Sequence, residues 1–214
     1  MSEYHNTKAE DRVPLGQKLA VGAGGFPIQN GGLIVQYMAQ PIFQIFLGLN
    51  PALFGLAMTI PRIWDAFTDP VMGRISDRTQ SRYGRRRPYV FVGALAVALT
   101  FLTIWMVPQS MGDTGTFLWL TIGSVLFFTA FTVFSVPFNA LVYEQTPDYH
   151  ERTRLMFYLA LFYNIGNLCV NWYVPATNWS GFENPLVGAR WIALGLALVV
   201  FLGRGILPAI FGKE

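Results

Sequence analysis

The chain alternates long apolar runs with short polar segments, and six of the runs are long enough to cross a lipid bilayer as helices. They cover about residues 17–47, 51–75, 88–107, 116–143, 154–174 and 187–210. About 20 apolar residues suffice to span a hydrocarbon core of about 30 Å. The pattern therefore predicts an all-α polytopic membrane protein whose residues 17–211 form one six-helix transmembrane bundle, preceded by a polar segment over residues 1–16.

The basic residues fall on one side of these predicted helices. Of the fifteen lysines and arginines, twelve lie on the side of the two termini: Lys8, Arg12, Lys18, Arg74, Arg78, Arg82, Arg85, Arg86, Arg87, Arg152, Arg154 and Lys213. The loops on the other side contain none. Because basic loops stay in the cytoplasm, both termini are predicted to be cytoplasmic and residues 1–16 to form a cytoplasmic tail. A bacterial inner membrane is the expected location.

Composition supports a membrane protein and disfavours other classes. Hydrophobic residues make up 53% of the chain and charged residues 13%, against about 25% charged in soluble domains. The lipid bilayer is thus an expected partner, and a net charge of +3 gives no indication of nucleic-acid binding. Cys169 is the single cysteine, so no internal disulfide is expected, and no stretch of the sequence resembles a metal-ligand cluster. No nucleophile is paired with a base, and we expect no enzymatic activity.

Three charged residues interrupt the second apolar run. Arg62, Asp65 and Asp69 are spaced three and four residues apart, which places them on one helical face. A charge near the bilayer centre costs about 2.5–3.5 kcal/mol on insertion scales and usually marks an ion or substrate path. The structural alternative, an Arg62–Asp65 ion pair, leaves Asp69 unexplained.

Uncharged polar residues form stripes on three further predicted helices. The stripes are Gln29, Gln36, Gln40 and Gln44 in the first run, Thr132, Ser135, Asn139 and Tyr143 in the fourth, and Asn164, Asn167 and Asn171 in the fifth. Helical periodicity places each set on one face. These faces are predicted to contact protein or water, either through interhelical hydrogen bonds or through contacts to a ligand.

Several motifs together carry a family resemblance. Gly73, Asp77, Arg78, Gly84, Arg85 and Arg86 match a Gly-x-x-x-Asp-Arg…Gly-Arg-Arg pattern. This segment resembles the loop between helices two and three of the major facilitator superfamily. Together with Trp-Asp-Ala-Phe-Thr-Asp-Pro at residues 64–70, and with residues 134–141 and 146–154, it resembles the glycoside–pentoside–hexuronide:cation symporter branch, whose best-known member is the melibiose permease.

The resemblance implies roles for named residues. Asp65 and Asp69 would form the cation site, with Arg62 as counter-charge. The Thr68 hydroxyl is either a further ligand or bonded to a carbonyl of its own helix. The ion would be H⁺ or Na⁺, or else Li⁺, with no other metal or cofactor. The implied cytoplasmic gate comprises Gly73, Asp77, Arg78, Gly84, Arg85 and Arg86, with Glu144 and Arg152 as partners. The substrate cavity would be lined by Gln29, Gln36, Ser135, Asn139 and Asn164.

The chain also departs from the permease. Gln29, Ser135 and Ala160 stand where the permease has two acidic residues and an arginine. A missing carboxylate at Ser135 favours a proton as coupling ion over Na⁺. The three changes also argue against a melibiose-like substrate.

Family transporters have twelve helices in two six-helix halves, whereas six are predicted here. We therefore expect a truncated N-terminal half, with residues 212–214 beginning the central cytoplasmic loop and a C-terminal six-helix half as partner. A homodimer of halves is an alternative. The predicted function is cation-coupled symport of a sugar or glycoside, a small-molecule substrate, by alternating access. A lipid or lysolipid carrier of the same branch and a non-transporting half that acts as a membrane scaffold are the alternatives.

Overall fold

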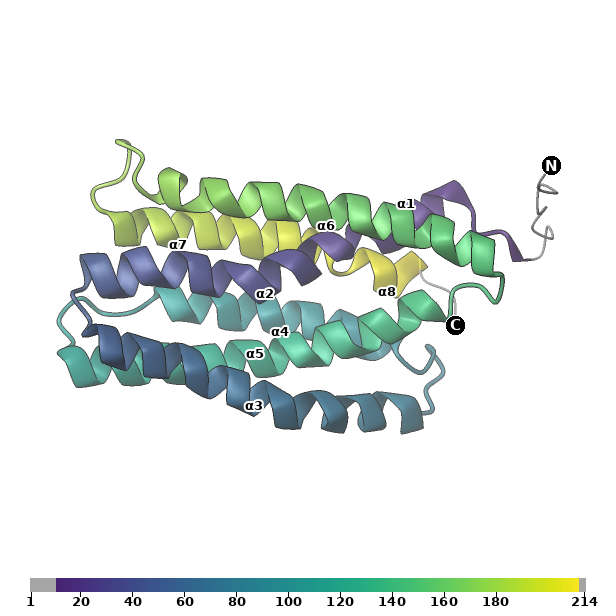
Figure 1. Ribbon diagram of the computed structural model, residues 1–214, viewed down its shortest axis with the longest axis horizontal. Helices are drawn as coiled ribbons and strands as arrows, with labels where there is room; N and C mark the ends of the chain where they lie inside the picture. The colour runs from purple at the N-terminus through teal and green to yellow at the C-terminus, as the bar shows by residue number, and fades with distance from the viewer. Residues whose placement is uncertain (1–10, 212–214) are drawn as a thin grey trace.

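The computed structural model describes residues 11–211, which form a bundle of long helices running roughly along one axis (Figure 1). The first helical segment comprises α1 (Leu15–Ala23), α2 (Gly25–Ala39) and the π-helical η2 (Gln40–Phe46). It is followed by α3 (Pro51–Arg78), α4 (Arg87–Trp105), α5 (Asp113–Tyr143) and α6 (Tyr149–Thr177). The C-terminal segment comprises α7 (Pro185–Leu196), the π-helical η3 (Ala197–Arg204) and α8 (Leu207–Phe211).

Every predicted apolar run corresponds to one of these helical segments, and the prediction of an all-α fold is confirmed. Within the described part of the chain, three helical stretches are long and apolar enough to cross a membrane: Arg87–Trp105, Asp113–Tyr143 and Pro185–Phe211. The first segment is divided between shorter helices, and α3 carries Arg62, Asp65 and Asp69. Six membrane spans therefore remain a prediction.

The start of α6 differs from the prediction. Residues 149–153, predicted to lie in a polar loop, form the first turn of α6. The cause is an N-cap: Asp148 Oδ1 accepts a hydrogen bond from the Glu151 backbone N–H at 2.7 Å. An Asp three residues before a Glu is a capping signal that the loop interpretation overlooked. The sequence prediction was wrong here because the local cap outweighs the polar composition.

The residues just before α1 are packed against the start of α6. The buried Val13 donates its backbone N–H to Glu151 Oε1 at 2.9 Å, and the Thr146 hydroxyl donates to the Asp11 carbonyl at 2.9 Å. The rest of the predicted tail, residues 1–10, and the predicted loop start at 212–214 lie outside the described residues. Residues 11–14 are thus anchored to the bundle.

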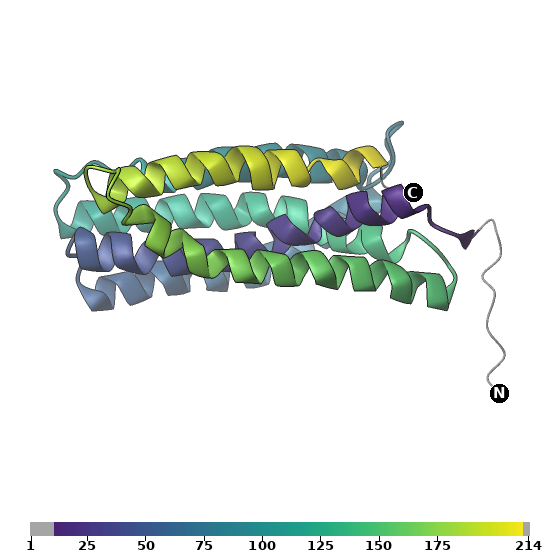
Figure 2. The same ribbon diagram turned by 90° about the horizontal axis from the view of Figure 1, so that it is seen from above.

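The helices pack in neighbouring pairs. α5 lies between α3 and α4 and packs against both, while α1 and α2 pack along α6. The C-terminal segment packs beside α4, and α8 lies next to α1 at one end of the bundle (Figures 1 and 2). α4 and α5 approach so closely that a Cβ on Gly93 would be 2.7 Å from the Phe134 backbone. Glycine at position 93 therefore permits this close approach of the two helices.

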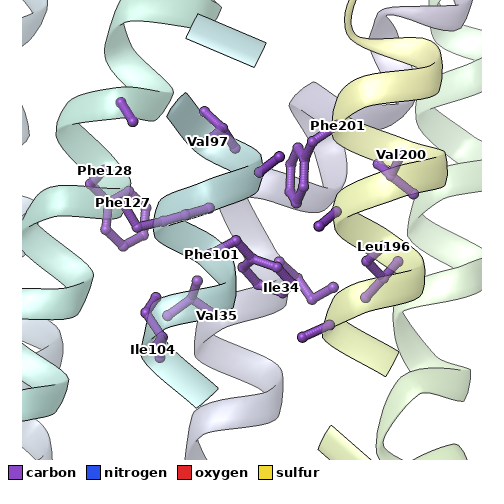
Figure 3. Packing of buried hydrophobic residues seen from close by; sticks show 14 of the residues in the cluster. Ile34, Val35, Val97, Phe101, Ile104, Phe127, Phe128, Leu196, Val200 and Phe201 are labelled. Carbon is purple, nitrogen blue, oxygen red and sulfur yellow. The ribbon is translucent and has the colours of Figure 1, made fainter. Parts of the chain in front are cut away.

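The core lies where α2, α4, α5 and η3 meet. Phe101 is fully buried, with ring centroids 5.6 Å from Phe127 and 5.4 Å from Phe201. Ile34 of α2 and Val200 of η3 lie around these rings (Figure 3). Burying each large apolar side chain contributes about 1.5–3 kcal/mol. The charged face of α3 lies outside this cluster.

Candidate functional site

The charged residues of the second apolar run lie in the middle of α3. The helix begins with Pro51 after Asn50, whose Oδ1 accepts the Ala52 N–H at 2.9 Å. Pro61 and Pro70 lie inside it and remove backbone donors near the charges. The charged residues sit between these two prolines, on a helix that packs against α5.

Arg62 is held mainly by groups other than Asp65. Its Nη2 donates to the Gly32 carbonyl at 3.1 Å, and its guanidinium lies 4.6 Å from the centroid of the Phe128 ring. The distance from its Nη1 to Asp65 Oδ2 is 4.0 Å, at the outer limit for an ion pair. Arg62 therefore supplies positive charge near Asp65 without neutralising it through a short contact.

Asp65 carries the polar atom of this region that lacks a partner. Its Oδ1 is buried and makes no hydrogen bond within residues 11–211, while the side chain as a whole is 21% exposed. A buried carboxylate oxygen without a donor is costly. A bound cation or a proton on the carboxyl group would remove this cost, so Asp65 fits the cation site that the sequence predicts.

Asp69 lies one helical turn further and is oriented by α5. Its Oδ1 accepts a hydrogen bond from the Thr132 hydroxyl at 2.8 Å, and Thr132 is buried. Sequence reasoning noted Thr132 only as part of a polar stripe and did not assign it to the site. Its position in that stripe, which also contains Ser135, was the available signal.

The Thr68 hydroxyl lies 3.3 Å from the Trp64 carbonyl and 3.4 Å from the Asp65 carbonyl of its own helix. The hydroxyl donates its proton to a backbone carbonyl, and the lone pairs of its oxygen remain available to contact a cation. Trp64 in turn donates to the Thr129 hydroxyl of α5 at 2.9 Å. Two α5 threonines thus contact this face of α3.

Two cavities lie beside α3 and are lined in part by residues close to the aspartates in sequence. One has a volume of about 270 Å³ and is lined by Val35, Gln36, Met58, Thr59, Arg62 and Phe128. The other, about 330 Å³, is mainly apolar and is lined by Trp64, Phe67, Thr68, Val71, Met72, Ile75, Thr129, Thr132 and Val133. Neither lining includes Asp65 or Asp69; Arg62 contributes to the first cavity, and Thr68 and Thr132 contribute to the second.

The predicted cavity residues are only partly brought together. Gln36 lines the cavity that contains Arg62, whereas that lining does not include Gln29, Ser135, Asn139 or Asn164. Asn139 and Asn164 are exposed, and Asn164 donates to the Ala160 carbonyl of its own helix at 2.8 Å. Within residues 11–211, no three His, Cys, Asp or Glu side chains come together as a metal site.

At the arginine-rich end, a charged network joins α3, the loop before α4, and α5. Arg86 donates to Asp77 Oδ1 at 2.6 Å and contacts Glu144 Oε2 at 2.7 Å. Arg85 contacts Glu144 Oε1 at 2.8 Å. The hydrogen bond from Arg86 holds the pKa of Asp77 below its usual value. The network thus ties the end of α3, the loop before α4 and the end of α5 to one another.

The other predicted gate residues have different surroundings. Gly84 has φ +99°, a conformation that favours glycine, whereas Gly73 has only an ordinary contact with Val136. Arg78 is exposed. Arg152 donates to the Thr146 carbonyl at 3.1 Å, on the segment between α5 and α6.

Comparison with known proteins gives a match over most of the chain. Residues 20–207 match the family model described as MFS/sugar transport protein. An uncharacterized symporter of Synechocystis sp. is 36% identical over 144 residues, covering 64% of this chain and 26% of that protein. The sodium-dependent lysophosphatidylcholine symporter 1-A of Danio rerio is 32% identical over 136 residues, covering 63% of this chain and 25% of that protein.

The putative glycoside/cation symporter YagG of Escherichia coli is 27% identical over 191 residues, covering 88% of this chain and 40% of that protein. The matched parts thus span between about a quarter and two-fifths of the length of these relatives.

Proposed function

The chain belongs to the family of MFS/sugar transport proteins, and we propose that it forms the N-terminal six-helix bundle of a cation-coupled symporter for a sugar or glycoside. Members of this symporter family are integral membrane transporters rather than enzymes. In the proposed complete transporter, a second six-helix bundle packs against this one and the substrate binds between them near the bilayer midplane. Both termini of this bundle are proposed to be cytoplasmic.

The observation that carries this proposal is the unsatisfied Asp65 Oδ1. Asp69 lies one turn away, and Thr132 fixes the orientation of its carboxylate. Carboxylate and hydroxyl oxygens are ligands that hard cations prefer. The proposed cation site therefore comprises Asp65 and Asp69, with the oxygens of Thr68 and Thr132 beside them and Arg62 as counter-charge.

Coupling follows from the charge of this site. Two carboxylates that move across a low-dielectric region carry a large desolvation cost, and a bound cation or proton reduces it. The loaded bundle can therefore reorient more easily than the empty one. The network of Arg85, Arg86, Asp77 and Glu144 would close the arginine-rich end when the substrate site faces the opposite side.

The nature of the substrate is proposed from the cavity beside Arg62. Gln36, Thr59 and Arg62 offer hydrogen-bonding groups to a ligand with several hydroxyls. The second candidate is a lysolipid, supported by the apolar cavity next to Phe67 and Val71 and by the lysophosphatidylcholine symporters among the relatives.

The test is uptake by the full-length protein, with a panel of sugars and glycosides and a lysophosphatidylcholine, under separate Na⁺, Li⁺ and pH gradients. Asp65→Asn and Asp69→Asn are each expected to lower cation-driven uptake by about 100-fold, or about 2.7 kcal/mol. Asp113→Asn, at the exposed start of α5, is the matched control and should transport normally. Undiminished cation-driven uptake in both variants would refute the cation site.

The coding sequence downstream of residue 214 tests the architecture independently. A second set of six apolar runs supports the two-bundle transporter. Its absence, together with a lack of uptake for every substrate on the panel, supports the non-transporting scaffold instead.

A further inference from the structure

We infer that a groove between α4 and α8 binds an anionic phospholipid from the leaflet at the arginine-rich end of the bundle. The groove has a volume of about 480 Å³ and is lined by Tyr83, Arg87, Pro88, Phe91, Val92, Ala209 and Ile210. We call it the α4–α8 groove. The inference rests on the proposed membrane orientation and is independent of the cation site.

Arg87 ties the two walls of the groove together. Its Nε donates to the Ala209 carbonyl at 2.6 Å, and its Nη2 donates to the Ile210 carbonyl at 2.7 Å. Arg87 thereby links the first turn of α4 to the last turn of α8. These hydrogen bonds fix the position of one wall of the groove relative to the other.

Arg82 adds a second positive charge at the groove. Its guanidinium lies 4.6 Å from the centroid of the Tyr83 ring, which lines the groove, and both side chains are exposed. Stacking on a ring restricts the guanidinium while leaving its N–H groups directed outward. A phosphate beside Tyr83 would meet Arg82 together with the positive field of Arg87.

An apolar track leads away from these charges along α4. Val92, Leu95 and Leu99 are exposed to 57%, 38% and 66%, and their spacing of three and four residues places them on one face. From Pro88 to Leu99 the helix rises about 16 Å at 1.5 Å per residue. This matches about half of a hydrocarbon core of about 30 Å, which is the depth of one leaflet and suits an acyl chain.

The charge of the α4–α8 groove and the apolar surface beside it indicate which kind of ligand would bind there. The residues that line the α4–α8 groove include no acidic side chain, and Arg82 and Arg87 lie in a loop rich in arginine. Basic sites between helix ends at the cytoplasmic surface attract anionic headgroups. The polar stripes expected to face substrate and the second bundle are on α2, α5 and α6, whereas this face of α4 is apolar. A phospholipid, with an anionic head and an apolar chain, complements both parts.

The test uses the purified full-length protein in detergent micelles with added phosphatidylglycerol or phosphatidylcholine, and native mass spectrometry to count retained lipids. The wild type should retain phosphatidylglycerol in preference to phosphatidylcholine. Arg82→Ala should lower phosphatidylglycerol retention about fivefold, equivalent to about 1 kcal/mol for one arginine. Val92→Trp, which fills the groove and leaves all charges in place, should lower it as well.

Arg74→Ala is the matched control, because Arg74 is an exposed arginine at the same end that does not line the groove. It should retain phosphatidylglycerol like the wild type. Equal losses in the Arg74 and Arg82 variants, or equal retention of both lipids by the wild type, would overturn the inference. Undiminished retention in Arg82→Ala would do the same, and would be expected if a protein segment covers the groove.

Discussion

The contact of α3 with α5 and the contact of α4 with the C-terminal segment both join long helices, but they treat polar groups differently. Between α4 and the C-terminal segment, Arg190 near the start of α7 donates to the Trp105 and Val107 carbonyls, both at 3.0 Å. Arg87 at the start of α4 donates reciprocally to carbonyls at the end of α8. The carbonyls left free at a helix end are thus satisfied by the neighbouring helix.

In the contact of α3 with α5, Asp69 and Trp64 have hydrogen-bond partners on α5, but Asp65 does not. Asp65 keeps a buried oxygen without a partner, and its distance to Arg62 is long. From this comparison we expect that a charged side chain with all its hydrogen-bond partners stabilises the packing of helices. A charged side chain that lacks a partner is instead expected to bind a ligand. Five substitutions test that difference, and the one with the largest expected effect on stability comes first.

Loss of Phe101 should destabilise the bundle most. Phe101→Ala removes a fully buried ring from the core and is expected to cost about 3–5 kcal/mol. Asp65→Asn should leave the unfolding temperature unchanged or raise it, because it removes a negative charge from a carboxylate whose buried Oδ1 has no hydrogen-bond donor. Thermal unfolding of the purified protein in detergent measures both. A large loss of stability in Asp65→Asn would show that this carboxylate is structural.

Glu151 is a buried carboxylate like that of Asp65, but its oxygens have hydrogen-bond and ion-pair partners. It contacts Lys18 Nζ at 2.6 Å, Val13 N at 2.9 Å and Arg154 Nη1 at 3.2 Å. Glu151→Gln should lower stability at neutral pH by about 3 kcal/mol, since Lys18 loses its buried partner. A milder effect than that of Arg190→Ala would contradict this assignment.

The same residue predicts a pH dependence. Burial raises the pKa of Glu151, but the hydrogen bonds from Lys18, Val13 and Arg154 outweigh it, so the pKa lies below its usual value. A depressed pKa means that the contribution to stability is present above the ordinary value of about 4.3 and disappears as the pH falls through the folded-state pKa. Melting curves of wild type and Glu151→Gln should therefore converge at acidic pH.

Arg190→Ala tests the contact between α4 and the C-terminal segment. It leaves the Trp105 and Val107 carbonyls without their donor and should cost about 2 kcal/mol, in the range for hydrogen bonds to charged groups. Cation affinity should stay unchanged. Arg74→Ala, at an exposed position, should shift stability by less than about 0.5 kcal/mol. A change in cation-coupled uptake in Arg190→Ala would contradict a purely structural role for Arg190.

Thr132→Val should act mainly on the ion rather than on the stability of the bundle. It removes the hydrogen bond to Asp69 with little change in volume and is expected to weaken cation affinity about fivefold, or about 1 kcal/mol. Thr121→Val is the control, because the Thr121 hydroxyl donates only within its own helix, to the Phe117 carbonyl at 2.8 Å. Equal cation affinities of the two variants in a cation-dependent uptake assay would exclude a role for Thr132.

Much of the architecture could be predicted from the chain alone, because apolar periodicity and charge spacing are local properties. The helical segments and the shared face of Arg62, Asp65 and Asp69 follow from spacing along one helix. The extension of α6 to Tyr149 could also have been predicted, since the cap formed by Asp148 is local. Its omission reflects a signal that was overlooked.

Contacts between helices could not be obtained in this way. The pairing of Asp69 with Thr132 joins residues 63 positions apart on α3 and α5. The same is true of Arg86, which bridges Asp77 and Glu144. The sequence by itself determined which residues carry charge into the predicted bilayer and on which helical face they lie. The tertiary structure decided which of those charged groups have hydrogen-bond or ion-pair partners, because the partners lie on other helices and their distances depend on how the helices pack.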